Sequence, residues 1–309
     1  MAFWVYLGLF LGVVVALSAP WIARTLPPRT GVWVLSAAAV TSAAGMLGIV
    51  GMIALTGAAR VPYLASEGNV SAVAWRHVDP IAAWAATLAA IVLTAGLALF
   101  VRGVWREVSA HVGVRRLVRA MSGNDRLVVV DDENPHAYAV GGRHGRIVVS
   151  RGLLRELSAD ERRAVLAHET AHLRSNHHVH LRVIRVAAAL NPLLRPCIPV
   201  AALAVERWAD EDTAAAVGDR TLVARALVRA ALAGASRKTA PRGTLAHTAN
   251  DVGQRVAALM QAPPRPRWTI AVATSVLLVA TAAAPVYAAD SFDNLLNSAA
   301  ARGGNSSVK

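Results

Sequence analysis

Four long apolar stretches constrain the fold of this chain more than any other feature of its sequence. They cover residues 2–23, 31–59, 81–101 and 268–289. Each holds the roughly 20 uncharged residues with which an α-helix crosses ~30 Å of hydrocarbon. Only 17% of the 309 residues are charged, whereas soluble domains carry about 25%. The first stretch lacks the positively charged N-terminal region of a signal peptide, and two more apolar stretches follow it closely. A multispan membrane protein is therefore favoured over a secreted protein with a signal peptide.

Arginines in the flanks of these stretches indicate how the chain crosses the membrane. They lie between the first two stretches, after the third and before the fourth: Arg24, Arg29, Arg102, Arg106, Arg115, Arg116, Arg119, Arg265 and Arg267. Such residues concentrate in short cytoplasmic flanks. The arrangement predicts a multi-pass cell (inner) membrane protein with both termini outside and residues 103–267 in the cytoplasm. Much of the net charge of +13 then faces anionic lipid, and no nucleic-acid binding is expected.

These boundaries predict the domains. Residues 1–102 are expected to form a three-helix transmembrane region, 103–267 a cytoplasmic domain, 268–289 a fourth transmembrane helix and 290–309 a short extracytoplasmic tail. The fourth stretch also resembles a signal peptide that is cleaved after Ala288, although a plain span is the favoured interpretation. The single cysteine has no partner for an internal disulfide or for a cysteine-based zinc site.

The cytoplasmic segment mixes strand and helix patterns. Ala-Tyr-Ala-Val ends at Gly141 and Gly142, and the run from Arg146 to Ser150 follows, which is typical of two strands around a glycine-rich turn. Ser158, with Glu161 three residues later, has the capping-box pattern that begins a helix. The pattern predicts, in order, a strand, a hairpin, a helix, a proline-broken turn and two more helices: residues 126–132, 137–150, 159–180, 191–199, 201–218 and 220–234.

The motif "HETAH" lies on the first of these helices. His168 and His172 are four residues apart, so both imidazoles lie on one face and can reach one metal ion. Glu169 is offset around the helix, where it can reach a metal-bound water and act as general base. Catalytic zinc takes three protein ligands and a water whose pKa falls to about 7. The motif therefore predicts a site for one zinc ion, with a third ligand from elsewhere in the chain.

Glu206 is the candidate third ligand, because the proline-broken turn lets its helix pack antiparallel to the motif. Asp210 lies one turn further on the same face and can accept a hydrogen bond from a ligand histidine. Glu211 and Asp212 are rotated off that face and are expected in solvent. A chance match on a solvated helix is the alternative, but it leaves the acidic second helix unexplained.

Three more histidines follow the motif. His177, His178 and His180 are candidates for metal or substrate binding, yet a solvated helix end near lipid headgroups is the favoured interpretation. A transition-state oxyanion needs a donor besides the metal. His177, His178, Arg220 and Arg255 are all candidates, and the sequence does not choose among them.

"HETAH", the downstream "ERWAD" and the preceding "AYAVGGRHGRIVVSRGLL" together resemble integral-membrane zinc endopeptidases of the gluzincin kind. Within that group, three spans, a cytoplasmic peptidase domain and one further span look most like the BlaR/MecR-type sensors. The resemblance implies a mainly α membrane protein: four transmembrane helices, with a cytoplasmic α+β zincin-like peptidase domain between the third and fourth. It implies His168, His172 and Glu206 as zinc ligands, Glu169 as base and Asp210 as supporting acid. It also implies that the strand Ile147, Val148, Val149, Ser150 holds the substrate at a sheet edge.

The chain departs from this family because only a short tail follows the last span, in place of a penicillin-binding domain. The resemblance still implies regulated proteolysis of a protein substrate, a BlaI-like cytoplasmic repressor, in an antibiotic or envelope-stress response. One alternative is an HtpX-type quality-control protease, whose spans are usually placed differently around the motif. A second is a non-enzymatic membrane scaffold with a metal site, which an intact Glu169 disfavours.

Overall fold

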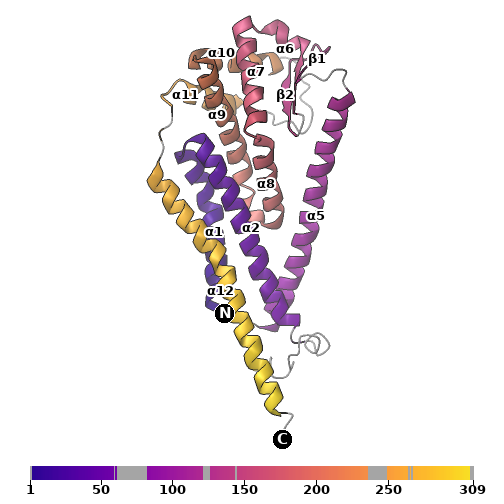
Figure 1. The fold of residues 1–309 in the computed structure, drawn as a ribbon, viewed down its shortest axis with the longest axis vertical. Coiled ribbons are helices and arrows are strands. Elements are labelled where there is room, and N and C mark those ends of the chain that lie inside the picture. The colour runs from indigo at the N-terminus through magenta and orange to yellow at the C-terminus, as the bar shows by residue number, and fades with distance from the viewer. Residues whose placement is uncertain are drawn as a thin grey trace.

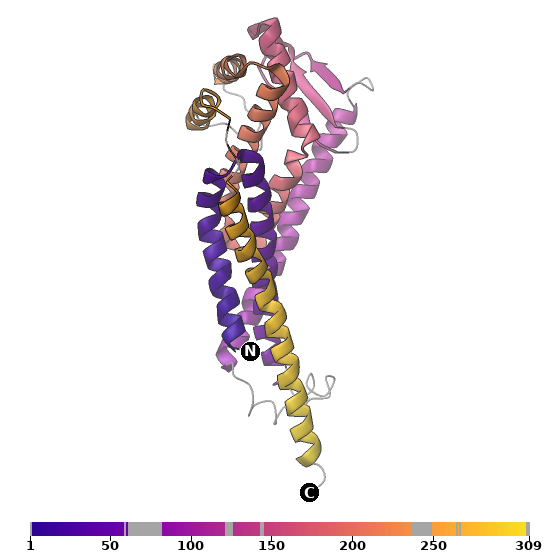
Figure 2. The same ribbon diagram turned by 60° about the vertical axis from the view of Figure 1, so that its left-hand side comes forward.

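The computed structural model describes residues 2–58, 60, 82–120, 126–142, 145–235, 249–263, 265 and 267–306. Four of its helices are long and apolar enough to cross a membrane, judged by length and composition. They are α1 (Ala2–Thr25), α2 (Pro28–Ala58), α5 (Ala83–Ala120) and α12 (Trp268–Ser306). Most of the remaining elements lie at one end of these helices, one helical hairpin extends back alongside them, and both termini lie at the opposite end (Figures 1 and 2).

The elements between α5 and α12 follow the predicted order. They are β1 (Leu127–Val130), β2 (Ala137–Val140), β3 (Arg146–Ser150), α6 (Arg151–Glu156), α7 (Ala159–Arg174), α8 (His177–Leu190), the 3-10 turn η1 (Pro192–Leu194), α9 (Cys197–Val217), α10 (Arg220–Ala235) and α11 (Ala249–Leu259). Pro199 lies in the first turn of α9, where the missing N–H costs nothing. The helix therefore begins before the proline, inside the segment expected to be a turn. At its other end Gly218 adopts a left-handed φ of 79°, as a helix-ending glycine does.

The last helix is longer than the apolar stretch that predicts it. α12 continues through residues 290–306, which were expected to form a tail, and extends past the ends of the other helices (Figure 2). Ten of the 17 residues in this segment are Asp, Asn, Ser or Gly, which are weak helix formers, so intrinsic propensity does not explain why the helix continues.

The sheet has the order β1-β3-β2, with β1 parallel and β2 antiparallel to β3. The strand from Ile147 to Ser150, expected at an edge, is therefore the central strand, and this expectation is wrong. Val148 and Ser150 are fully buried, and both edges of the strand are hydrogen-bonded to neighbours. Its uninterrupted β-branched run is typical of such a buried strand. Within the sheet that the structure describes, the edge strands to which a peptide could add are β1 and β2.

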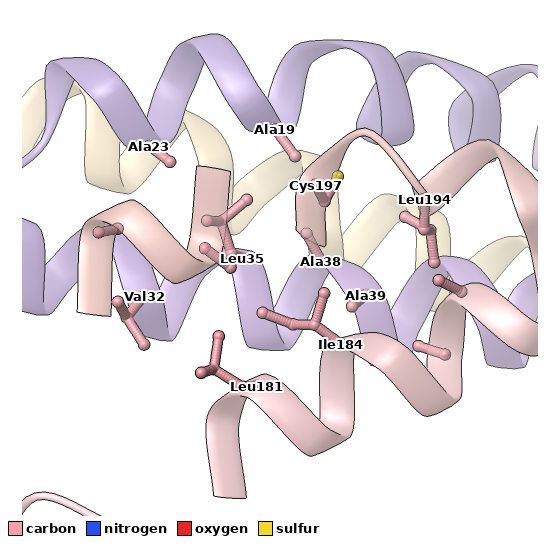
Figure 3. Close-up of a cluster of buried hydrophobic side chains, with 14 of the residues drawn as sticks. Ala19, Ala23, Val32, Leu35, Ala38, Ala39, Leu181, Ile184, Leu194 and Cys197 are labelled. Carbon is pink, nitrogen blue, oxygen red and sulfur yellow. The ribbon is translucent and has the colours of Figure 1, made fainter. Parts of the chain in front are cut away.

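The hairpin formed by α8, η1 and α9 packs alongside the apolar helices rather than apart from them. Buried side chains of the hairpin meet those of α1 and α2, as Figure 3 shows for Ala19, Ala23, Val32, Leu35, Ala38, Ala39, Leu181, Ile184, Leu194 and Cys197. Near the hairpin tip, Asn191 Nδ2 donates to Ser42 Oγ at 3.0 Å, close to the midpoint of α2. Many of the contacting residues are alanines, which allow helices to approach closely. The hairpin thus connects the histidine motif to the apolar helices α1 and α2.

Candidate active site

The helix that carries the histidine motif begins where the sequence predicts. The Ser158 N–H donates to Glu161 Oε2 at 2.9 Å, and the Glu161 N–H donates to Ser158 Oγ at 3.4 Å. This reciprocal pair is a capping box, which satisfies two N–H groups that the first turn leaves without helical partners. The predicted start of the helix at residue 159 is confirmed.

The same helix ends earlier than predicted. α7 stops at Arg174, and Asn176 adopts a left-handed conformation with φ 51° and ψ 40°. Asparagine tolerates this region better than most residues, so the chain can turn there before α8 begins at His177. The expected continuous helix to residue 180 is wrong, and the break allows His177 to fold back toward His172.

His168, His172 and Glu206 converge on one point between α7 and α9. His172 Nε2 lies 3.1 Å from His168 Nε2, and Glu206 oxygens lie 3.3 Å from His168 Nε2 and 3.6 Å from His172 Nε2. Three ligands at the usual zinc distances in a tetrahedron stand about 3.3–3.5 Å apart. The spacing of the donor atoms and the two-nitrogen, one-carboxylate donor set therefore fit a zinc ion.

The metal-binding face remains partly open. The side chains of His168 and His172 are 15% and 18% exposed, whereas Glu206 is 9% exposed. A structural zinc site is closed by a fourth protein ligand, whereas a catalytic one leaves a position for water or substrate. The three-residue donor set with partial exposure has the second pattern. Glu169, the next residue on α7, is also only half-buried.

Asp210 contacts His168, the first ligand histidine, at the ring nitrogen that faces away from the metal position. His168 Nδ1 lies 3.2 Å from Asp210 Oδ1, which leaves Nε2 directed at the metal position. A carboxylate acceptor at Nδ1 fixes the tautomer and orients the ring of a ligand histidine. The structure therefore brings together Asp210 and His168 as the sequence predicts.

Arg255 of α11 closes this network. Its Nε and Nη2 each donate to an Asp210 oxygen at 2.7 Å, and its Nη1 lies 3.2 Å from Glu206 Oε2. The side chain is 2% exposed. All three guanidinium nitrogens thus face carboxylates of the site, and the expectation that Arg255 stabilises an oxyanion is wrong. The guanidinium is a buried counter-charge for two carboxylates, one of them a candidate metal ligand.

The pKa values of these groups follow from the network. Burial alone would neutralise Glu206 and Asp210, but hydrogen bonds from histidine and arginine outweigh it, so the pKa of Glu206 lies well below its usual value and that of Asp210 is also lowered. Burial opposes the charge on His168, yet its hydrogen bonds to Asp210 and Glu206 raise its pKa to about 10 in the protein without metal. Both carboxylates are therefore ionised, which Glu206 needs in order to act as a metal ligand.

His177 contacts His172, the second ligand histidine, at the ring nitrogen that faces away from the metal position. Its Nδ1 lies 3.0 Å from His172 Nδ1, and its ring packs against Trp208 with centroids 4.5 Å apart. Burial lowers the pKa of His177 to about 3, so the ring is neutral. When His172 Nε2 faces a metal, its Nδ1 carries the proton, and His177 Nδ1 can accept it. The sequence analysis missed this role, although the Ser-Asn pair before His177 is a signal for the helix break that creates it.

The other candidates have different surroundings. His177 and His180 are buried, and His180 Nδ1 lies 2.9 Å from Ser36 Oγ of α2, so the expected solvated helix end is wrong for both. Arg220 forms a bidentate ion pair with Glu211 and donates to two backbone carbonyls at the end of α11. Because these contacts hold its guanidinium away from the metal ligands, Arg220 is no longer a candidate oxyanion donor. His178 is half-buried beside Gly141, where a Cβ would collide with its ring.

Two acidic residues that were expected in solvent have partners. Glu211 pairs with Arg220, with a shortest distance of 2.6 Å. Asp212 Oδ2 accepts from Ser175 Oγ at 3.4 Å, at the break between α7 and α8. Both contacts link α9 to neighbouring elements, so these side chains help to place the helix that carries Glu206.

The segment that carries this site is similar to known peptidases. The model of peptidase family M48 matches residues 104–262. Among curated proteins, a protease HtpX homolog of Thermodesulfovibrio yellowstonii is 34% identical over 80 residues, which cover 25% of this chain and 27% of the relative. Protease HtpX homologs of Lactiplantibacillus plantarum and Listeria monocytogenes are 34% and 38% identical over 64 residues, which cover 20% of this chain and 21% of each relative.

These alignments span only about a quarter or less of the length of the curated relatives. No solved structure matches the chain significantly. The names of the relatives favour the HtpX-type alternative over the BlaR/MecR-type resemblance.

Proposed function

The chain belongs to peptidase family M48, and from this premise we propose that it is a membrane-bound zinc endopeptidase of the HtpX type that degrades damaged or misassembled membrane proteins. M48 enzymes are zinc metallopeptidases, and the histidine–carboxylate set described above suits that metal. The observation that carries the proposal is the triangle of His168, His172 and Glu206 at zinc spacing on a partly open face, with Glu169 beside it.

The proposed reaction is hydrolysis of a peptide bond. Zinc, when bound, supplies a Lewis acid that makes water nucleophilic near neutral pH. Glu169 accepts a proton from the attacking water as the new C–O bond forms, and returns a proton to the amide nitrogen as the C–N bond breaks. Asp210 and His177 keep the two ligand imidazoles in the tautomers that leave each Nε2 free for the metal.

We propose β2 as the strand that binds the substrate, in place of the central strand β3. β2 is an edge of the described sheet, and it packs against α7, the helix that carries the motif. An extended peptide can add to such an edge through main-chain hydrogen bonds. His178 touches Gly141 directly after β2, so it is the remaining candidate donor to the oxyanion.

We further propose that the chain crosses the inner membrane four times with both termini outside and the peptidase segment in the cytoplasm. The four apolar helices and the flanking arginines support this topology. Because the α8–α9 hairpin packs along the spans, the zinc site stands close to the membrane surface. Substrate segments just outside the bilayer are therefore the ones within reach.

The second candidate is regulated cleavage of a BlaI-like repressor. One observation favours it: three apolar helices precede the peptidase segment and one follows it, the arrangement on which the BlaR/MecR-type resemblance rests. The HtpX names of the relatives weigh against it. Antibiotic sensing and signal transduction remain predictions that belong to this candidate alone.

Replacement of Glu169 tests the proposed activity. The full chain and its Glu169→Gln variant are reconstituted in lipid vesicles with an unfolded membrane-protein substrate, and the zinc content of both is measured. Glu156→Gln, which alters an exposed carboxylate at the end of α6, is the matched control. We expect Glu169→Gln to keep its zinc and lose cleavage by at least 100-fold, about the lower contribution of a general base. Equal cleavage by Glu169→Gln and wild type would refute Glu169 as the general base and, with it, the proposed peptidase mechanism. No cleavage by either protein would favour the non-enzymatic scaffold.

Comparative proteomics of cells that carry wild type or Glu169→Gln separates the two candidates. Quality control predicts that many membrane proteins accumulate in the variant. The repressor candidate instead predicts that one cytoplasmic DNA-binding protein becomes stable. The second pattern would reject the HtpX-type proposal while it leaves peptidase activity intact.

A further inference from the structure

A cavity of about 390 Å³ lies at the end of the bundle that carries the peptidase elements, apart from the zinc ligands. It is lined by the end of α1 and the turn into α2, by α9, and by the linker between α11 and α12. Four arginines from these segments line it: Arg24, Arg207, Arg265 and Arg267. No acidic residue is among its lining residues, so the cavity is strongly positive.

None of these arginines has an ion-pair partner in the part of the chain that the structure describes. Elsewhere, arginines at the peptidase end are paired, such as Arg255 with Asp210 and Arg220 with Glu211. Arg207 has a buried Nε that finds no hydrogen-bond partner among the described residues. A buried donor on a charged group is costly without an acceptor, and like charges around one cavity repel. An anion bound in the cavity would give the Arg207 Nε an acceptor and offset the repulsion among the arginines.

The position of the cavity identifies the kind of anion. Arg24 lies in the last turn of α1, and Arg267 directly precedes α12, so the cavity stands where two apolar helices end. Trp21 and Trp268, at the same ends, are 64% and 74% exposed. Tryptophan is enriched at the headgroup level of membranes. The anion that is abundant at this level is the phosphate of a phospholipid.

We infer that the cavity binds the headgroup phosphate of an anionic phospholipid, held by Arg207 and by arginines of the α1 end and the α11–α12 linker. The site would connect membrane composition to the zinc centre, because Arg207 directly follows Glu206 on α9. The linker also leads from α11, which places Arg255 against Asp210. A bound lipid would therefore contact α9, which carries Glu206, and the linker from α11, which carries Arg255.

Native mass spectrometry of the full chain in detergent tests this site. The protein is titrated with phosphatidylglycerol, with phosphatidylcholine of the same chains, and separately with inorganic phosphate. We expect one phosphatidylglycerol to bind at least 10-fold more tightly than phosphatidylcholine. An arginine near a membrane surface contributes about fivefold to such binding, so Arg207→Gln with Arg265→Gln should weaken it about 30-fold.

The control removes the same charge elsewhere. Arg102→Gln with Arg106→Gln alters two exposed arginines of α5 that are outside the cavity, and the preference for phosphatidylglycerol should remain. If the Arg207 variant does not fold, Arg24→Gln with Arg265→Gln alters two exposed side chains and should give the same loss. Equal losses in the α5 control would mean diffuse attraction and overturn the proposal. So would inorganic phosphate that binds as tightly as phosphatidylglycerol.

Discussion

Replacement of Arg255 by glutamine tests whether the buried network holds the site together. The guanidinium is 2% exposed, and it donates to both Asp210 oxygens at 2.7 Å while contacting Glu206 at 3.2 Å. Removal of one partner from a buried ion pair costs about 3–5 kcal/mol, because the remaining charge stays buried without compensation. Here two carboxylates lose their common partner. We therefore expect a loss near that range in the free energy of unfolding.

The measurement is the thermal midpoint of the chelator-treated protein in detergent, followed by tryptophan fluorescence. A loss of about 3 kcal/mol corresponds to a fall of at least about 6 °C for a domain of this size. The matched control is Arg151→Gln, which breaks an ion pair with Asp131 at 3.0 Å whose side chains are 56% and 76% exposed. Exposed pairs contribute about 0–1 kcal/mol, so this midpoint should hardly move.

Arg255→Lys adds a test of geometry. Lysine keeps the charge but cannot match both Asp210 oxygens with a planar fork, so we expect a midpoint between those of wild type and Arg255→Gln. If Arg255→Gln and Arg151→Gln shift the midpoint equally, burial does not decide the strength of the pair. The counter-charge role of Arg255 would then be refuted.

Three further outcomes are expected. His177→Ala should weaken zinc binding 10–100-fold, measured in competition with a fluorescent chelator. His177→Gln should restore part of the affinity, because its side chain again offers His172 a hydrogen-bond acceptor. Equal zinc affinities of His177→Ala and wild type would contradict the role of His177. In the zinc-free protein the raised pKa of His168 stabilises the fold fully below pH 6.5, and this stabilisation is lost as the pH rises to about 10. Thermal midpoints across that range should fall in wild type but not in His168→Gln. Ser158→Ala should cost about 1 kcal/mol in denaturant unfolding, and no change would mean that the capping box is dispensable.

Local patterns allowed much of the site to be predicted. The four-residue spacing of His168 and His172 places both on one helix face in any α-helix, and the capping box sets where that helix begins. Glu206 and Asp210 share a face for the same reason. The hairpin of β2 and β3 was also predicted correctly, because Gly141 and Gly142 form a turn signal between two short strand-like segments.

The errors concern partners that are distant in the sequence. The strand β3 was expected at a sheet edge, but whether a strand is central depends on β1, which pairs with it from about 20 residues earlier. Arg255 was one of four candidate oxyanion donors, because the sequence does not show which residues lie beside it. Its contact with Asp210, 45 residues away, arises only when α11 packs on α9.

The sequence by itself determined the apolar spans, the ligand spacing and the start of the motif helix, because each depends on residues within a few turns of one another. Tertiary structure decided which charges were neutralised. It paired Arg255 with two carboxylates, turned His177 toward His172 after the break at Asn176, and left Arg207 in a cavity without a carboxylate. Charge interactions depend on distance and burial, and these are established only when separate helices pack together.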